Sequence, residues 1–308
     1  MRVSSSQYHI TVNASLQTAN SQLEKLMGQM ASGNRLTRPS DDPISHVRIS
    51  RLQREEANNA QYLDNISALS SRMTQSESVL SNINNDFLEA RDLLVWALDG
   101  TNTANDLAAM ATNLSSLRDS LHASTLTRDQ EGNYLFSGTN VKSPTVLLDG
   151  TKGVGQRYTM GGNADEQLVQ VGNGLMQPAN VVLTDGKTDK NMAHWLNTID
   201  LAVEALGQGK TANDPGVRKA LQDALNMVDV GMDEVSTRIS RLGGNQNIIA
   251  TIETNIRNLS TANQVSILDY AQLDYAEAAM QLNTLTAAIQ ATQGAYGKVS
   301  KLSLFDVL

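Results

Sequence analysis

The chain has 308 residues, a net charge of −8, no cysteine and only 4% aromatic residues. Without cysteine there are no disulfides and no thiolate chemistry, and the acidic balance without a basic tract argues against a nucleic-acid partner. The N-terminal stretch MRVSSSQYHITVNASLQ lacks the apolar core of a signal peptide. No stretch reaches the roughly 20 apolar residues of a membrane span, so we expect no cleaved signal and no membrane insertion.

The first segment has apolar residues at alternating steps of three and four, the spacing of a coiled-coil seam. These positions are Val12, Leu16, Ala19, Leu23, Leu26 and Met30. Gly33 follows them, where a glycine typically ends a helix. Asp42 precedes Pro43, and this pair predicts the cap and the first residue of a second helix.

Helical spacing continues after Pro43, is interrupted by a turn at DGTN (residues 99–102), and then resumes in a third helix that we expect to fold back on the second. The seam positions are Ile66, Leu69, Met73, Ser76, Leu80, Ile83, Phe87, Ala90 and Leu94 before the turn, and Leu107, Met110, Leu114, Leu117 and Leu121 after it.

Between about residues 132 and 190, short apolar runs are closed by Gly or Asp-Gly. The runs are YLFSG, PTVLLDG, QRYTMGG, EQLVQVGNG and NVVLTDG. This texture is typical of strands and tight turns, and it predicts a small β-rich domain of five or six strands. Helical spacing returns over residues 191–207, and Asp214-Pro215 repeats the helix start at Asp42-Pro43.

The last hundred residues carry the longest seam, with a slip in the pattern at Gly243-Gly244. A second register then runs without interruption through Leu268, Ala271, Tyr275, Ala278, Leu282, Leu285, Ile289, Thr292, Tyr296 and Val299. The helical segments at the two ends of the chain have similar lengths, so we expect them to lie side by side.

The patterns together predict a mainly α fold, an elongated helical rod with terminal coiled-coil helices and a small inserted β-rich domain. We expect a terminal coiled-coil domain from residues 1–42 with 268–308, and a helical core domain from 43–131 with 211–267. Residues 132–210 would form a β-rich outer insert with one helix. Each terminal segment has one narrow apolar stripe, so we expect it to order fully only against other subunits; a coiled coil closed within one chain is the alternative.

Candidates for catalysis or ligand binding are few. The four histidines, His9, His46, His122 and His194, are scattered without metal-ligand neighbours. GQGKT (residues 207–211) imitates the end of a phosphate-binding loop, but Glu204 stands where the motif needs its first glycine. Asp41 and Asp42 could form a carboxylate site, but at a helix start capping explains them better. We therefore expect no enzyme activity, no cofactor and no metal.

Three stretches resemble the bacterial flagellin superfamily. ASGNRLTRPSDDP (residues 31–43) resembles its N-terminal signature, and LDYAEAAMQLNTLTAAIQATQGAYGKVSKLSLFDVL (residues 273–308) resembles its terminal helix. GNYLFSGTNVKSPT (residues 132–145) is similar to the segment that opens the insert in the hook–filament junction branch. The proline in PSDDP also fits that branch better than filament flagellin, whose turn usually continues with alanines.

This resemblance implies a structural subunit that joins the flagellar hook to the filament outside the cell, after type III export without a cleaved signal. The implied partners are copies of itself in a ring, a neighbouring hook-associated protein, flagellin, and an export chaperone on the C-terminal helix. A filament flagellin is the alternative within the superfamily, and a non-flagellar coiled-coil adhesin or scaffold is the alternative outside it.

In the same picture the terminal helices form an inner tube, and their apolar side chains are candidates for subunit interfaces, with Leu285 exposed until assembly. The candidates are Leu16, Leu23, Leu26, Met30, Leu282, Leu285, Ile289 and Tyr296. Arg35 and Arg38 are candidates for pairing with carboxylates on adjoining chains, whereas Asp42 and Asp214 are the expected helix caps.

Overall fold

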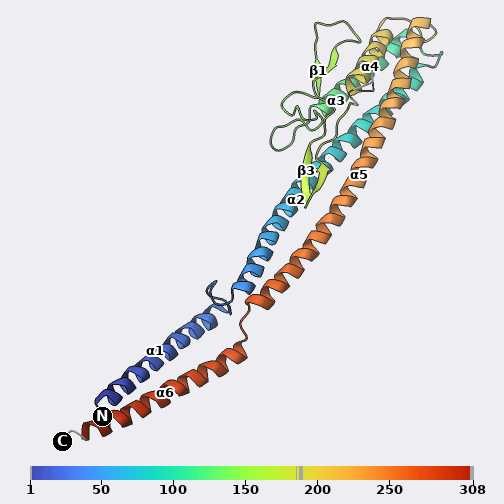
Figure 1. The fold of residues 1–308 in the computed structure, drawn as a ribbon. Helices are drawn as coiled ribbons and strands as arrows, with labels where there is room; N and C mark the ends of the chain where they lie inside the picture. Colours follow the sequence, from blue (N-terminus) through green and yellow to red (C-terminus); the bar gives the residue numbers. More distant parts are fainter. Residues whose placement is uncertain (1, 185, 187–189, 306–308) are drawn as a thin grey trace. The chain divides into compact units, whose positions relative to one another are not determined.

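The computed structural model describes residues 2–184, 186 and 190–305, and it confirms the prediction of a mainly α fold (Figure 1). Six helices occur in the described residues: α1 (Arg2–Ser32), α2 (Pro43–Ala97), α3 (Ala104–Thr125), α4 (Met192–Gly207), α5 (Pro215–Ala271) and α6 (Tyr275–Phe305). The end of the expected terminal segment, residues 306–308, and the side chain of Val299 lie outside this description.

The chain forms two compact units. The terminal unit comprises residues 1–58 and 257–308, and the central unit comprises residues 59–256. Both unit boundaries fall inside long helices, α2 and α5. The expected terminal domain therefore lies within the terminal unit and the expected β insert lies within the central unit, whereas the expected helical core domain has residues in both.

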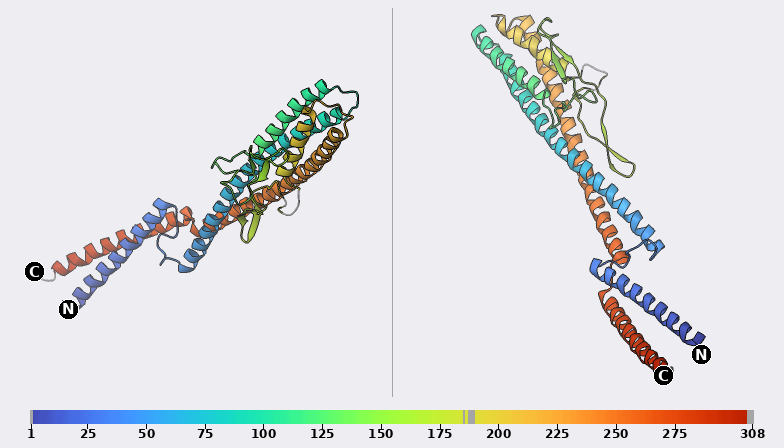
Figure 2. Two further views of the ribbon diagram at one scale, coloured as in Figure 1. Left: turned by 90° about the horizontal axis from the view of Figure 1, so that it is seen from above. Right: turned by 90° about the vertical axis from the view of Figure 1, so that its left-hand side faces the viewer.

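The central unit is built around side-chain packing between α2 and α5, which run antiparallel (Figure 2). Arg91 Nε lies 2.8 Å from Asp229 Oδ1, and Gln246 Nε2 lies 2.9 Å from Glu77 Oε2. Helices α3 and α4 pack on each other and contribute to the same apolar core, in which the ring of Phe87 meets that of Trp195 edge-on at 5.9 Å.

The described residues contain four short strands in two separate antiparallel pairs, so the insert has strands as predicted but fewer than the expected five or six. β1 (Val146–Leu148) pairs with β2 (Tyr158–Met160), and β3 (Leu168–Gly172) pairs with β4 (Leu175–Pro178). The run YLFSG is apolar because Leu135 and Phe136 are buried in the core, although it forms no strand. The apolar residues of this run therefore indicated burial in the core and not a β-strand.

The slip at Gly243-Gly244 does not break the helix, because α5 continues through it to Ala271. A glycine in a helix interior costs about 1 kcal/mol relative to alanine. Leu242 and Ile249, on either side of the glycines, are both buried in the central core, and their packing holds the helix together. The real break comes at residues 272–274, inside the register that the sequence predicted to be continuous.

Candidate functional site

The segment between α1 and α2 is a joint that closes on a second joint between α5 and α6. Gly33 ends α1 with a φ of 71°, a left-handed conformation that favours glycine. Asn34 then forms an antiparallel bridge with Gln272. Arg35 N donates to Ala271 O at 2.8 Å, and Leu273 N donates to Gly33 O at 3.0 Å. The two breaks therefore satisfy each other's backbone groups.

Side chains strengthen this double joint at both helix ends. Arg35 Nη2 donates to Tyr270 O at 3.1 Å, near the end of α5, and lies 3.5 Å from Asp42 Oδ2. Tyr275 Oη, at the start of α6, donates to Met30 O at 3.1 Å. Both donors satisfy carbonyl groups that a helix terminus leaves without an intrahelical partner.

Asp41 organises the loop of the first joint. Its Oδ2 accepts hydrogen bonds from Thr37 N at 3.3 Å and Arg38 N at 3.1 Å, while Lys25 Nζ lies 2.7 Å from its Oδ1. The hydrogen bond from Lys25 and those from the loop lower the pKa of Asp41 from 3.8 to about 2. This carboxylate is engaged within the chain, which is a structural role.

Asp42 caps α2. Its Oδ1 accepts from Ser45 N at 3.1 Å, and Ser45 Oγ donates to its Oδ2 at 2.6 Å. The Ser45 hydroxyl, the Ser45 amide and Arg35 hold the pKa of Asp42 below its usual value. No cluster of His, Asp or Glu in the described part of the chain could hold a metal ion.

Asp214 caps α5 in the same way. Its Oδ1 accepts from Gly216 N at 3.0 Å and Val217 N at 3.2 Å, and Lys210 Nζ lies 3.3 Å from its Oδ2. The Val217 amide is the main cause of its lowered pKa. Lys210, which the sequence singled out within GQGKT, therefore contributes to a helix start.

The terminal helices α1 and α6 lie antiparallel in the terminal unit. Leu26, Leu273 and Ala278 form a small buried cluster, with Met30, Leu282 and Leu285 packed against it. Leu16 and Leu23 are half-buried, Ile289 is buried, and the Tyr296 ring meets His9 edge-on at 5.3 Å. The structure thus brings most of the expected apolar set together within one chain, and Leu285 is half-buried there rather than exposed as expected.

Arg35 and Arg38 differ in their surroundings. Arg35 uses its guanidinium inside the joint, and its pairing with a carboxylate of an adjoining chain stays a prediction. The side chain of Arg38 is exposed and has no hydrogen-bond or ion-pair partner among the described residues.

Sequence reasoning missed the second joint. Its cap is Asp274, whose Oδ1 accepts from Ala276 N at 2.9 Å and Glu277 N at 3.2 Å. An acidic residue three positions after a potential cap marks a helix start, and Asp274 with Glu277 has this spacing. The apolar spacing continues across the break and includes Tyr275, which is exposed. The capping pattern of Asp274 and Glu277 was therefore overlooked.

The terminal unit buries few apolar side chains and leaves many large ones exposed. Among the residues whose burial is described, its buried apolar side chains are Leu26, Leu273, Ala278 and Ile289, against 37 buried residues in the central core. It nevertheless has half of the large apolar side chains that are exposed, although it is the smaller unit. These are Tyr8, Ile10, Met27, Ile44, Val47, Leu259, Val265, Leu268, Tyr275 and Met280.

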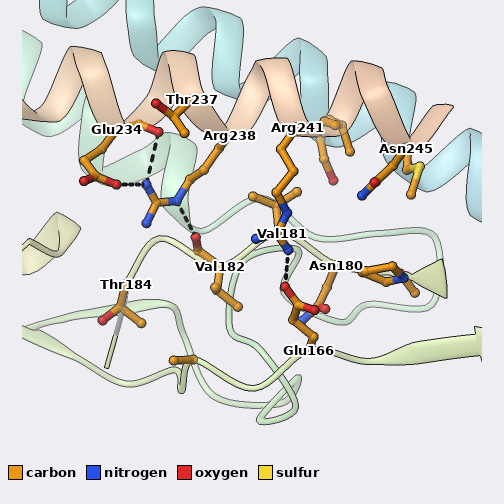
Figure 3. Close-up of a pocket in the computed structure, with 16 residues that line it drawn as sticks. Glu166, Asn180, Val181, Val182, Thr184, Glu234, Thr237, Arg238, Arg241 and Asn245 are labelled. Carbon is orange, nitrogen blue, oxygen red and sulfur yellow. Dashed lines mark hydrogen bonds and ion pairs between the residues drawn. The ribbon is translucent and has the colours of Figure 1, made fainter. Parts of the chain in front are cut away.

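The central unit has a pocket of about 310 Å³ between α5 and residues 164–184 (Figure 3). Its charged side chains are paired with each other. Arg238 Nη1 lies 2.6 Å from Glu234 Oε2 while its Nε donates to Val182 O at 2.7 Å, and Arg241 pairs with Glu166. These bonds brace the strand-containing segment against α5.

The histidines lie on different elements. His122 Nε2 is 3.2 Å from Val146 O, where it ties α3 to β1, and His9, His46 and His194 lie in α1, α2 and α4. None of the helices in the described residues has the length and apolar character of a membrane-crossing segment.

Comparison with known proteins identifies relatives over nearly the whole chain. Residues 3–141 match the family model of the bacterial flagellin N-terminal helical region. Flagellar hook-associated protein 3 of Salmonella typhimurium is 25% identical over 299 residues, and that of Escherichia coli is 27% identical over 305 residues; in both cases 94% of each chain is covered. A solved structure from Vibrio parahaemolyticus, described as a flagellar hook-associated protein, is 27% identical with a TM-score of 0.67 and covers 75% of this chain and all of its own.

Proposed function

We propose, from its similarity to flagellar hook-associated protein 3 and to the flagellin N-terminal region, that the chain is a flagellin-like structural protein of the bacterial flagellum and that it joins the hook to the filament. In this proposal it forms a ring of identical subunits between a neighbouring hook-associated protein and flagellin. Its role is mechanical and not enzymatic.

The imbalance between the two units is the observation that supports this role. Among the residues whose burial is described, the terminal unit has a buried cluster of three, Leu26, Leu273 and Ala278, yet exposes ten large apolar side chains. Helices gain most of their stability from packing on a partner, and soluble monomers rarely expose large apolar surfaces without a function. A subunit that completes its terminal unit against neighbouring subunits explains both features.

We further propose that the apolar candidates along α1 and α6 contribute to these contacts through the parts of their side chains that stay exposed in the single chain. Leu16, Leu23 and Leu282 are only half-buried in the single chain, so further burial is available on assembly. In the same proposal the chain leaves the cell through the flagellar type III apparatus, with a chaperone protecting α6 before assembly.

Deletion of the gene tests the junction role. Cells without this protein should keep their hooks, lack filaments and release flagellin monomers into the medium, because export continues while flagellin has nothing on which to assemble. Full filaments on such cells would rule out a junction role. A complementing copy of the gene should restore the filaments.

Filament flagellin is the second candidate, favoured by the match of residues 3–141 to the flagellin N-terminal model. The same experiment separates the two, since loss of the main flagellin would leave no flagellin in the medium. An adhesin or a coiled-coil scaffold outside the flagellum would leave filaments and swimming unchanged.

A further inference from the structure

The first turns of α2 present a face that combines apolar and cationic side chains. Ile44 and Val47 are 69% and 66% exposed, and Arg51 and Arg54 follow them at helical steps of three and four. Residues at this spacing share one side of a helix. We call Ile44, Val47, Arg51 and Arg54 the basic face.

The arginines of this face have no carboxylate partner among the residues that the structure describes. Arg51 has no hydrogen-bond or ion-pair partner in the part of the chain that the structure describes, and Arg54 donates only to Ser50 O, at 3.4 Å. Arg48, on the neighbouring side of the helix, is used differently: its Nη1 donates to Tyr270 Oη at 3.2 Å. The chain thus separates arginines that stabilise its own fold from arginines that face solvent.

A groove of about 600 Å³ lies between α1 and α6, also in the terminal unit. Leu26 and Leu285 contribute apolar surface to it, Met280 is 65% exposed beside them, and Glu277 lies one turn away from Met280. The Glu277 carboxylate accepts a hydrogen bond from Gln281 Nε2 at 3.1 Å and has no cationic partner among the described residues. We call this feature the terminal groove.

We propose that the basic face of one copy docks into the terminal groove of the next copy. Ile44 and Val47 would cover Met280 and the apolar residues beneath it, while Arg51 would reach Glu277. The two surfaces have complementary character, because an arginine beside apolar side chains meets a carboxylate beside apolar side chains. Lys25 also lines the groove, but its charge is paired with Asp41 at 2.7 Å. Both remain exposed in the single chain, so its fold does not already use this contact.

The geometry of such a contact is head to tail, because the two surfaces are different parts of the same chain. Contacts of this kind repeat from copy to copy and close into a ring or continue as a helix. The inference deepens the proposed junction role and rests on it, since it names the surfaces through which neighbouring copies meet.

The absence of cysteine from the sequence makes a direct test clean, because any introduced cysteine is unique. Val47→Cys and Met280→Cys would be made in separate copies of the gene and co-expressed in cells that lack the natural gene. Isolated flagella would then be treated with a short bis-maleimide cross-linker. A dimer of this chain should form with the co-expressed pair and be absent when either variant is expressed alone.

Met27→Cys is the matched control for the groove. Met27 is an exposed methionine on α1 that is not part of the groove lining. Paired with Val47→Cys, it should give at least several-fold less dimer. Incorporation of both Val47→Cys and Met280→Cys with no more dimer than this control would overturn the inference while leaving the junction role intact.

Other outcomes also decide the question. Dimers from Val47→Cys alone would indicate a two-fold contact between basic faces, and cross-links from Met280→Cys to a different protein would give the groove another occupant; either result overturns the head-to-tail contact. Absence of the chain from the flagella would overturn the junction role and this inference together.

Reciprocal charge reversal tests the polar part of the contact. Arg51→Glu and Glu277→Arg should each reduce the cross-linked dimer several-fold, because each places like charges opposite one another. The double variant should restore most of it. Two single variants that assemble and cross-link as well as the parent would show that Arg51 and Glu277 do not meet.

Discussion

Replacing Asp200 with asparagine should destabilise the central unit strongly. The Asp200 side chain is 2% exposed, its Oδ1 lies 2.6 Å from Arg118 Nη1, and its Oδ2 accepts from Gly155 N at 3.1 Å. Removing one partner of a buried ion pair costs about 3–5 kcal/mol, because the other charge stays buried without compensation. Arg118 keeps a bond to Asp119 Oδ1 at 2.8 Å, so we expect the lower end, about 3 kcal/mol.

For a unit of this size, about 3 kcal/mol corresponds to a fall in Tm of about 6–12 °C. Scanning calorimetry would measure the shift, and near-ultraviolet circular dichroism would follow the buried Trp195. Asp119→Asn is the control: the Asp119 side chain is 62% exposed, and surface pairs are worth only about 0–1 kcal/mol. If Asp200→Asn shifts the Tm no more than Asp119→Asn does, the ion pair is not buried in solution as the structure has it.

Three further results are expected from the terminal unit. Leu285→Asp should abolish incorporation into flagella while the Tm of the central unit stays unchanged, because Leu285 packs only in the terminal cluster; the exposed Asn283→Asp is the control, and a lowered central Tm would contradict this. Limited proteolysis of the monomer should trim roughly the first 40 and last 40 residues, whose helices bury little surface, and an uncut N-terminus on mass spectrometry would contradict it. The folded pKa of Asp41 lies below its ordinary value, so its contribution to stability is complete above pH 3.8 and is lost as the pH falls toward about 2. The exchange protection of the Thr37 amide, which donates to Asp41, should fall over that range and be low at every pH in Asp41→Ala, which has no acceptor.

The helices could be predicted from the sequence because each has a periodic apolar stripe and a chemical start signal. Asp42 and Asp214 precede prolines, and both accept hydrogen bonds from amides of the first helical turn. Caps and periodicity are local properties, so a single sequence contains them in full. This explains why the helix starts at Pro43 and Pro215 coincide with the prediction.

The strands could be predicted only in part. PTVLLDG, QRYTMGG and EQLVQVGNG contain β1, β2 and β3, which pair in local hairpins, whereas YLFSG and NVVLTDG contain none of the four strands. The limits of the strands could not be read from the sequence. β1 and β2 have three residues each, too short for an alternating pattern to stand out. Leu183, within the apolar run NVVLTDG, is fully buried without being in a strand. Tertiary packing set the conformation of these segments, and strand propensity is a weak guide where burial decides.

The double joint shows why the sequence predicted the break between α1 and α2 and missed the break between α5 and α6. Gly33 and Asp42 are recognisable helix-end and helix-start signals at the first break. At the second break the cap is Asp274, but the apolar spacing continues across it, so the sequence pattern shows no interruption. The two breaks are nevertheless one structure, since Arg35 N and Leu273 N each donate across them. The ends of α1 and α5 are therefore held by the same pair of hydrogen bonds. A substitution that loosened Gly33 would consequently loosen both breaks together, and each break lies next to one surface of the proposed contact, the basic face after Asp42 or the terminal groove after Asp274.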